Sequence, residues 1–198
     1  KEIFLSTYIC HPSMANNEVS GPVVMTAIAK ELEQKKLNYT IRIVFIPETI
    51  GSIVYLSKNL QILKKSVVAG FNITCVGDSN CYSFIPSRNG KTISDMVAIH
   101  TLKHIDNKFK KYTWFDRGSD ERQYCAPGVD LPIASITRSK YGEYPEYHTS
   151  LDDLKFISQE GLEGSVEVYL KAISIINDNY IPKPLIICEP NMGKRGLY

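Results

Sequence analysis

Apolar and polar residues along this chain form two kinds of pattern that alternate from one end to the other. Segments dense in β-branched and aromatic residues predict strands, and segments with apolar residues three or four positions apart predict helices. The predicted strands are residues 1–10, 39–48, 66–76, 111–116 and 131–139. The predicted helices are residues 22–36, 52–65, 94–106 and 160–178. Strands that alternate with helices are typical of an α/β fold with three αβα layers, in which helices cover both faces of a mixed, mostly parallel sheet.

Two local signals add detail to this prediction. Residues 39–48, "YTIRIVFIPE", are apolar enough to predict a strand deep in the sheet. Ser20 stands just before the helix over residues 22–36 and is a suitable N-cap, because a serine hydroxyl accepts a hydrogen bond from a free N–H of the first turn.

The same pattern predicts the domain organisation. Residues 1–180 form one α/β domain, and residues 181–198, with their prolines and glycines, form a connector toward a further domain. Because residues 1–10 already have the composition of a core strand, we expect further strands of the sheet upstream of this sequence.

Composition narrows the classes of partner. A chain of 198 residues with 23 Lys+Arg and 21 Asp+Glu has a formal net charge of +2, so we expect no nucleic acid and no membrane as partner. No apolar run is long enough to cross a bilayer. The five cysteines include no CxxC pair, which favours free thiols in the cytoplasm over a disulfide framework. The sequence leaves the oligomeric state open.

Histidines and acids follow several predicted strands at the point where each strand ends. Because the carboxyl ends of parallel strands meet at one edge of a sheet, we expect these side chains to lie together there. Two histidines and an acid, with a glutamate nearby, are what a catalytic zinc site requires. Each residue alone is more simply explained as a loop or cap residue, so the prediction depends on the whole set. The set is His11, Asn17, Glu48, Asp120, Glu121, His148 and Asp152.

A second histidine pair does not indicate zinc. His100 and His104 are four residues apart on a predicted helix, but Thr101 stands where helical zinc proteases have glutamate. A solvated helix face explains this pair.

Five motifs in order resemble those of the zinc aminopeptidases of the co-catalytic metallo-exopeptidase superfamily. They are "CHPSMANNEVSG", "PETIGS", "GSDERQY", "GVDLPIASI" and "YHTSLDDL", and the resemblance covers residues 3–178. The chain is most similar to a bacterial aminopeptidase-like family associated with surface-polysaccharide biosynthesis loci. The resemblance implies a zinc-exopeptidase-like, phosphorylase/hydrolase-like fold, and a C-terminal winged-helix domain beyond the connector.

The resemblance also implies a set of metal ligands. His11 and Asp120 match two ligands of one metal, and His148 matches a ligand of the second metal. Asn17 stands where the family has an aspartate that bridges both metals.

Two departures reduce the negative charge of the implied site. Glu48 matches the family's general base, but Thr49 stands where the family has a second, metal-binding glutamate. Together with Asn17, this removes two anionic groups, so we expect one zinc ion, with two as the alternative. Glu18 and Glu121 are the candidates for restoring charge.

The sequence supports three functions. The first is a zinc-dependent aminopeptidase-like hydrolase that cleaves an amide bond in a small peptide or amide, with Glu48 activating water. In this reading Tyr141, Tyr144 and Glu146 contact the substrate, although packing alone also explains the tyrosines. The second is a hydrolase or transferase acting on an amino-sugar or acyl-amino substrate in glycan synthesis. The third is a non-catalytic binding module with a degenerate metal site.

Overall fold

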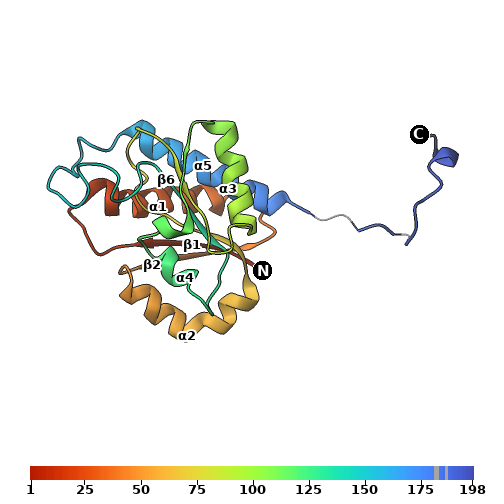
Figure 1. Ribbon diagram of the computed structural model, residues 1–198, viewed down its shortest axis with the longest axis horizontal. Coiled ribbons are helices and arrows are strands. Elements are labelled where there is room, and N and C mark those ends of the chain that lie inside the picture. The colour runs from red at the N-terminus through yellow and green to blue at the C-terminus, as the bar shows by residue number, and fades with distance from the viewer. Residues whose placement is uncertain (181–182, 186) are drawn as a thin grey trace.

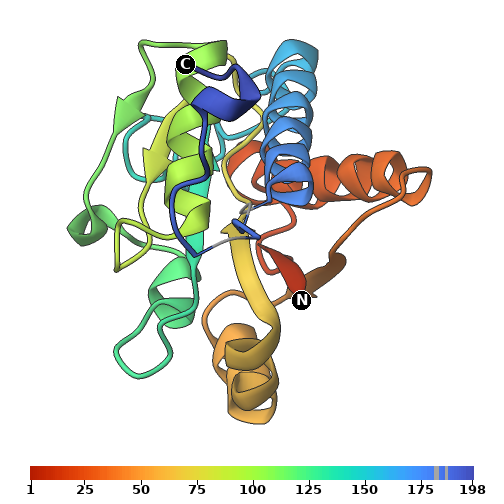
Figure 2. The same ribbon diagram turned by 90° about the vertical axis from the view of Figure 1, so that its right-hand side faces the viewer.

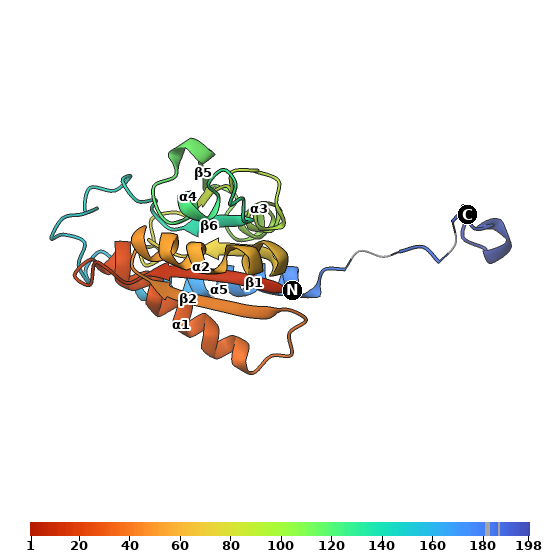
Figure 3. The same cartoon turned by 90° about the horizontal axis from the view of Figure 1, so that it is seen from below.

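The centre of the computed structural model, which describes residues 1–180, 183–185 and 187–198, is a six-stranded sheet. The strand order is β2-β1-β3-β6-β4-β5. Figure 3 shows the sheet with β2 at the bottom and β5 at the top. Neighbouring strands are parallel except β4 and β6, which are antiparallel, so the predicted mixed and mostly parallel sheet is confirmed. The strands are β1 (Glu2–Tyr8), β2 (Thr40–Ile46), β3 (Val67–Asn72), β4 (Ser83–Ile85), β5 (Lys110–Lys111) and β6 (Ile133–Thr137).

Helices cover both faces of the sheet (Figure 1). Helices α1, α3 and α5 pack together on one face, and α2 and the short α4 pack on the other. The side view in Figure 2 shows α2 separated from α1 and α5 by the strands. The helices are α1 (Ser20–Glu33), α2 (Ile50–Ser66), α3 (Ile93–Ile105), α4 (Glu121–Tyr124) and α5 (Gln159–Asp178), with a π-helical turn η1 (Ala15–Val19) and the 3₁₀ turns η2 (Trp114–Asp116) and η3 (Gly193–Arg195).

The alternation of side chains along β1 shows why both faces need covering. Ile3 and Leu5 are fully buried against the α1/α3/α5 layer, whereas Phe4 is fully buried against the α2/α4 layer. A parallel strand that is buried on both faces has a nearly continuous apolar sequence. The apolar run at the start of the chain therefore predicts its central position correctly.

The register of the sheet aligns the strand ends from which the site is built. Tyr8 at the end of β1 pairs with Ile46 at the end of β2, and Ser6 pairs with Asn72 at the end of β3. The loops that follow these three parallel strands therefore leave the sheet at the same edge. This is the edge at which open α/β sheets bind their ligands.

One strand prediction was wrong in part, and one strand was missed. Of residues 111–116 only Lys111 lies in a strand, because Asp116 accepts hydrogen bonds from the N–H and hydroxyl of Thr113 and closes η2. The antiparallel strand β4 was missed, since three residues are too short for a periodic signal.

The predicted places of β2 and Ser20 were also wrong. Within the described residues β2 is an outer strand, and Phe45 on it is 42 % exposed. Ser20 is not an N-cap, because η1 runs directly into α1. Its hydroxyl instead donates to the carbonyl of Asn16 and accepts from the N–H of Val76.

The predicted connector falls partly outside the described residues, namely at 181, 182 and 186. Leu185 and Ile187 in the described part are fully exposed, and Figure 1 shows the C-terminal end apart from the sheet. The connector's role remains a prediction. Among the described residues, no helix has both the length and the apolar character that crossing a membrane requires.

Helix α1 approaches the sheet closely at Gly21. A Cβ atom built there would overlap the hydroxyl of Thr7 and lie 2.7 Å from the carbonyl oxygen of Ile73, so only glycine fits between α1 and the two strands. This contact fixes the start of α1 at the sheet edge where the loops meet.

We expect Gly21→Ala to lower the free energy of unfolding by about 1–3 kcal/mol, because the added methyl group must displace the backbone of Ile73, just beyond the end of β3. Thermal unfolding followed by circular dichroism measures this as a lower Tm. Gly193→Ala is the control, since the nearest atom to a Cβ there is 3.6 Å away. An unchanged Tm for Gly21→Ala would show that α1 is not held this close.

Candidate metal centre

His11 lies three residues beyond the end of β1, at the edge of the sheet. Its ring nitrogen Nδ1 is 3.0 Å from Oε2 of Glu18 and 3.2 Å from Sγ of Cys10. Glu18 belongs to η1 and is only 3 % exposed. A buried carboxylate and a thiol thus meet at one imidazole nitrogen.

His148 comes to the same place from a loop more than 130 residues away in the sequence. The ring centroids of His11 and His148 are 5.6 Å apart, so the two predicted histidines do meet. The ring of His148 stacks on Tyr147 at 4.0 Å, and its backbone has a positive φ of 56°. This uncommon backbone conformation turns the loop at the histidine.

Asp152 joins the His148 loop to η1. Its two carboxylate oxygens accept the backbone N–H groups of Asn16 at 2.6 Å and Asn17 at 3.0 Å, and its own carbonyl accepts from Ala15. Hydrogen bonds from N–H groups to a carboxylate are shorter and stronger than neutral ones. Asp152 is 1 % exposed and its charge is used entirely within the fold.

Asp120 is buried with half of its hydrogen-bonding capacity in use. Oδ1 accepts the N–H of Thr49 and the hydroxyl of Ser52, both at 2.8 Å, whereas Oδ2 has no partner among the described residues. Burial raises the pKa of Asp120 to about 6, against the effect of these two hydrogen bonds. An unpaired buried carboxylate oxygen is a suitable ligand for a cation.

Glu48 follows β2 and is half-buried. Burial raises its pKa, while a hydrogen bond with Ser119 and the charge of His11 act in the opposite direction. Its backbone N–H lies 3.3 Å from Sγ of Cys10 and donates to it, which places Glu48 beside the cysteine. The next residue, Thr49, has φ 60° and lies at the centre of a tight γ-turn closed by Ile50 N–H and Glu48 carbonyl at 2.7 Å.

Asn17 is almost fully buried and serves the fold through its amide group. Nδ2 donates to the hydroxyl of Tyr8 at 2.7 Å, a bond that a carboxylate cannot make. Oδ1 has no hydrogen-bond partner in the part of the chain that is described. The carbonyl of Asn17 accepts from Tyr8 and Thr74.

The residues predicted to contact substrate lie in the loop that carries His148. The hydroxyl of Tyr141 donates to Glu121 at 2.6 Å, and that of Tyr144 lies 3.4 Å from Oδ2 of Asp152. Both tyrosines are buried and Glu146 is half-buried. Both tyrosine hydroxyls therefore support other residues of the edge.

Glu121 is held too firmly to restore charge at His11. Its Oε1 accepts the N–H groups of Gly118 and Ser119 as well as the Tyr141 hydroxyl, and Oε2 accepts from Asn72. Of the two candidates, only Glu18 contacts His11.

The structure brings together a candidate ligand group that sequence reasoning found only in part, because it named His11, and Glu18 as a candidate for restoring charge, but not Cys10. Among the described residues, Cys10, His11 and Glu18 bring potential ligand atoms within 4.8 Å of one another, whereas the predicted set of His11, Asp120 and His148 is more widely spread. The signal in the sequence was Cys10, which directly precedes His11. Glu18 could not be assigned because its direction depends on the π-helical turn.

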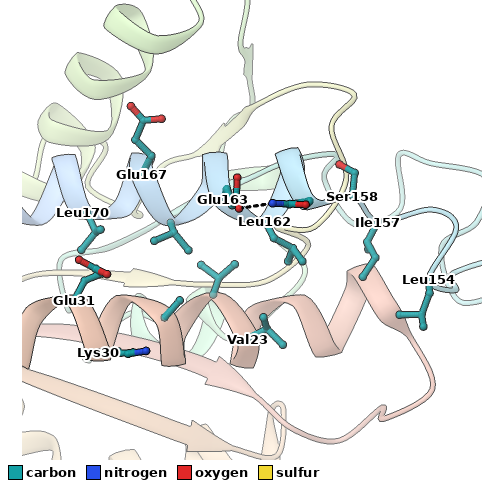
Figure 4. Close-up of a pocket in the computed structure, with 14 residues that line it drawn as sticks. Val23, Lys30, Glu31, Leu154, Ile157, Ser158, Leu162, Glu163, Glu167 and Leu170 are labelled. Carbon is teal, nitrogen blue, oxygen red and sulfur yellow. Dashed lines mark hydrogen bonds between the residues drawn. The ribbon is translucent and has the colours of Figure 1, made fainter.

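A cavity of about 900 Å³ lies elsewhere, between α1 and α5. In Figure 4 the side chains of Val23, Leu162 and Leu170 point into it, and Glu167 points away. Its lining is mainly apolar and includes none of the predicted site residues. The candidate chemistry therefore lies at the sheet edge, and not in this groove.

Comparison with known proteins places the chain in a family. The profile of the family described as "Domain of unknown function (DUF4910)" matches residues 1–179. The chain belongs to this family. A Clostridium acetobutylicum protein named "Putative polysaccharide biosynthesis protein with aminopeptidase-like domain" is 42% identical to this DUF4910 chain over 203 residues, which cover 100% of the chain and 45% of that protein.

Solved structures agree with this assignment. A crystal structure titled as a "putative peptidase" from Clostridium acetobutylicum matches with 42% identity and a TM-score of 0.87, over 98% of the chain and 46% of that structure. The zinc aminopeptidase BSAP from Bacillus subtilis matches with 19% identity and a TM-score of 0.73, over 91% of the chain and 47% of its own, and shows the same fold.

These findings confirm the predicted resemblance and fold class. The DUF4910 chain is an aminopeptidase-like α/β domain. It spans about half the length of the relatives it matches.

Burial of Asp120 has a consequence for pH dependence in the metal-free protein. Its pKa is about 6 in the folded state and about 3.8 when unperturbed, so the folded state binds the proton more tightly. Its contribution to stability is therefore largest below pH 4 and falls by up to roughly 3 kcal/mol as pH rises through 6.

We expect the wild type to lose stability relative to Asp120→Asn as pH rises from about 4 to about 7. Urea unfolding of both proteins in EDTA across this range measures the difference, and other titrating groups cancel in it. Parallel curves would contradict the perturbed pKa.

Proposed function

We propose that this domain is a metal-dependent hydrolase of an amide bond that uses one zinc ion bound through His11. The observation that carries the proposal is the meeting of Cys10, His11 and Glu18 beside Glu48. A nitrogen, a sulfur and a carboxylate oxygen form a donor set suited to zinc. The carboxylate of Glu48, beside this set, is suited to act as a general base.

The surrounding residues fit a cation. Oδ2 of Asp120 and Oδ1 of Asn17 are buried oxygens without partners within the described chain. The sequence-predicted set of ligands is His11, Asp120, His148 and Asn17. The second set is Cys10, His11 and Glu18, so His11 is common to both. Either set has enough ligands for one ion but fewer anionic ligands than a two-metal centre requires.

Glu48 is the proposed catalytic base. Zinc, when bound, supplies Lewis acidity that polarises the amide carbonyl and acidifies water. Glu48 takes a proton from the attacking water and passes it to the leaving nitrogen, so that the C–N bond breaks and an acid and an amine are released. Its raised pKa suits this exchange, because a carboxyl nearer to neutrality both accepts and returns the proton.

The substrate is proposed to lie against the loop that carries His148. Glu146, half-buried in this loop, is the proposed residue for binding a free amino group, as an aminopeptidase substrate requires. Tyr141 and Tyr144 form the buried base of the loop and orient Glu121 and Asp152.

A second candidate substrate class is an acylated amino sugar. The name of the Clostridium acetobutylicum relative connects it with polysaccharide biosynthesis, and such a substrate contains the same amide bond. We also propose a cytoplasmic location, for which the five free cysteines are the support.

We expect Glu48→Gln to lower turnover by about 10²–10⁴-fold, because glutamine cannot accept the proton, while bound zinc is unchanged. Aminoacyl amides and N-acylated amino sugars are the test substrates, and zinc is measured by mass spectrometry. Glu33→Gln, an exposed acid at the end of α1, is the control.

Activity that survives in Glu48→Gln would remove Glu48 as the base. Inertness of the zinc-loaded wild type toward both substrate classes, or absence of zinc binding, would favour the non-catalytic binding module.

A further inference from the structure

We infer that Cys10 and Glu18 are themselves ligands of the ion, so that the centre is a Cys–His–Glu site with a thiolate ligand. The inference rests on the metal binding in the proposed function and names its ligands. The sequence offered Glu18 only as a candidate for restoring charge and did not predict Cys10, which brings sulfur chemistry that the predicted residues lack.

The distances around His11 are close to those between two ligands of one metal. Two atoms bound to one zinc ion about 2.0–2.3 Å away, at a tetrahedral angle, lie about 3.3–3.6 Å apart. The observed separations from Nδ1 are 3.2 Å to Cys10 Sγ and 3.0 Å to Glu18 Oε2. Small rotations of the side-chain torsions that widen these separations by a few tenths of an ångström suffice to admit the ion.

Hydrogen bonding within this cluster uses Nδ1 of His11 for only one of its two neighbours at a time. Nδ1 has either one N–H or one lone pair, depending on the tautomer. With an N–H it donates well to one of two acceptors, the sulfur or the carboxylate; with a lone pair it accepts from the thiol and faces the carboxylate oxygen. A cation between the three atoms serves all of them at once.

The cluster is held in place by its surroundings. Cys10 accepts the backbone N–H of Glu48, and Glu18 is nearly fully buried in η1, whose wide turn is closed by Val19 N–H and the Met14 carbonyl at 3.0 Å. Glu18 makes its hydrogen bond to His11 although such burial is costly for a carboxylate. Because Glu18 is buried, water does not compete with a metal ion for its carboxylate, which faces the histidine and the thiol.

The donor types select the metal. Sulfur and nitrogen ligands favour zinc and related transition metals over Mg²⁺ and Ca²⁺, which prefer oxygen. Three protein ligands leave the fourth tetrahedral position open, as in catalytic zinc sites. His11 is about two-fifths exposed, so a substrate could reach the cluster from the His11 side.

Cobalt(II) tests the inference by spectroscopy and without a substrate. The 198-residue chain, freed of metal and kept anaerobic, is titrated with Co²⁺, and Mg²⁺ serves as the negative control. We expect d–d bands and a near-ultraviolet thiolate-to-cobalt charge-transfer band. Cys10→Ser should abolish the charge-transfer band, and both Cys10→Ser and Glu18→Gln should weaken Co²⁺ affinity by at least about tenfold.

Cys188→Ser, another exposed cysteine, is the matched control and should keep both band and affinity. The Tm of each metal-free variant shows whether it is folded, and Cys10→Ser tests the site even if Glu18→Gln does not fold. Bound cobalt without a charge-transfer band, or an unchanged affinity in Cys10→Ser, overturns the Cys–His–Glu site but leaves the metal-dependent hydrolase standing. Absence of any cobalt or zinc binding overturns both.

Discussion

The pair of hydrogen bonds from η1 to Asp152 is the interaction on which the edge of this domain depends. The N–H groups at the start of a helical turn have no partner within the turn, and a carboxylate satisfies two of them at once. Because Asn16 and Asn17 are 136 and 135 positions from Asp152, these bonds fold the C-terminal third of the domain back onto its first loop. The imidazoles of His11 and His148 lie near each other as a consequence.

Near the hydrogen bonds between η1 and Asp152, the buried acids are of two kinds: those whose carboxylate oxygens all have hydrogen-bond partners, and those with an oxygen that has none. Asp152 and Glu121 each accept several hydrogen bonds and serve the fold. Asp120 keeps one oxygen unpaired and a pKa near 6, and Glu48 is held beside a strained turn at Thr49. Uncompensated charge and backbone strain lower stability and are concentrated at functional sites. Their coincidence at one edge separates the site from the rest of the structure.

The sequence predicted those features that depend on periodicity and on the direction of the strands. Alternating apolar segments predicted the layers, and the rule for carboxyl ends predicted that His11 and His148 would meet. It could not predict that β2 is an outer strand among the described residues, because apolar content indicates which faces of a strand are buried and not how many strands lie beside it. Nor could it place Glu18, since the extra residue of a π-helical turn rotates every side chain in it relative to an α-helix.

Asn17 and Thr49 stand where the resemblance implies carboxylates, and the structure gives the amide of Asn17 a donor role that a carboxylate could not fill. The amide of Asn17 donates to Tyr8, and the hydroxyl of Thr49 accepts from Arg122 while its N–H holds Asp120. The bond from Asn17 to Tyr8 shows that this amide is built into the edge of the sheet, and is not simply a carboxylate that has lost its charge. Negative charge near His11 comes instead from Glu18, one residue along the chain from Asn17. This favours a centre rebuilt for one ion over the remnant of a centre for two.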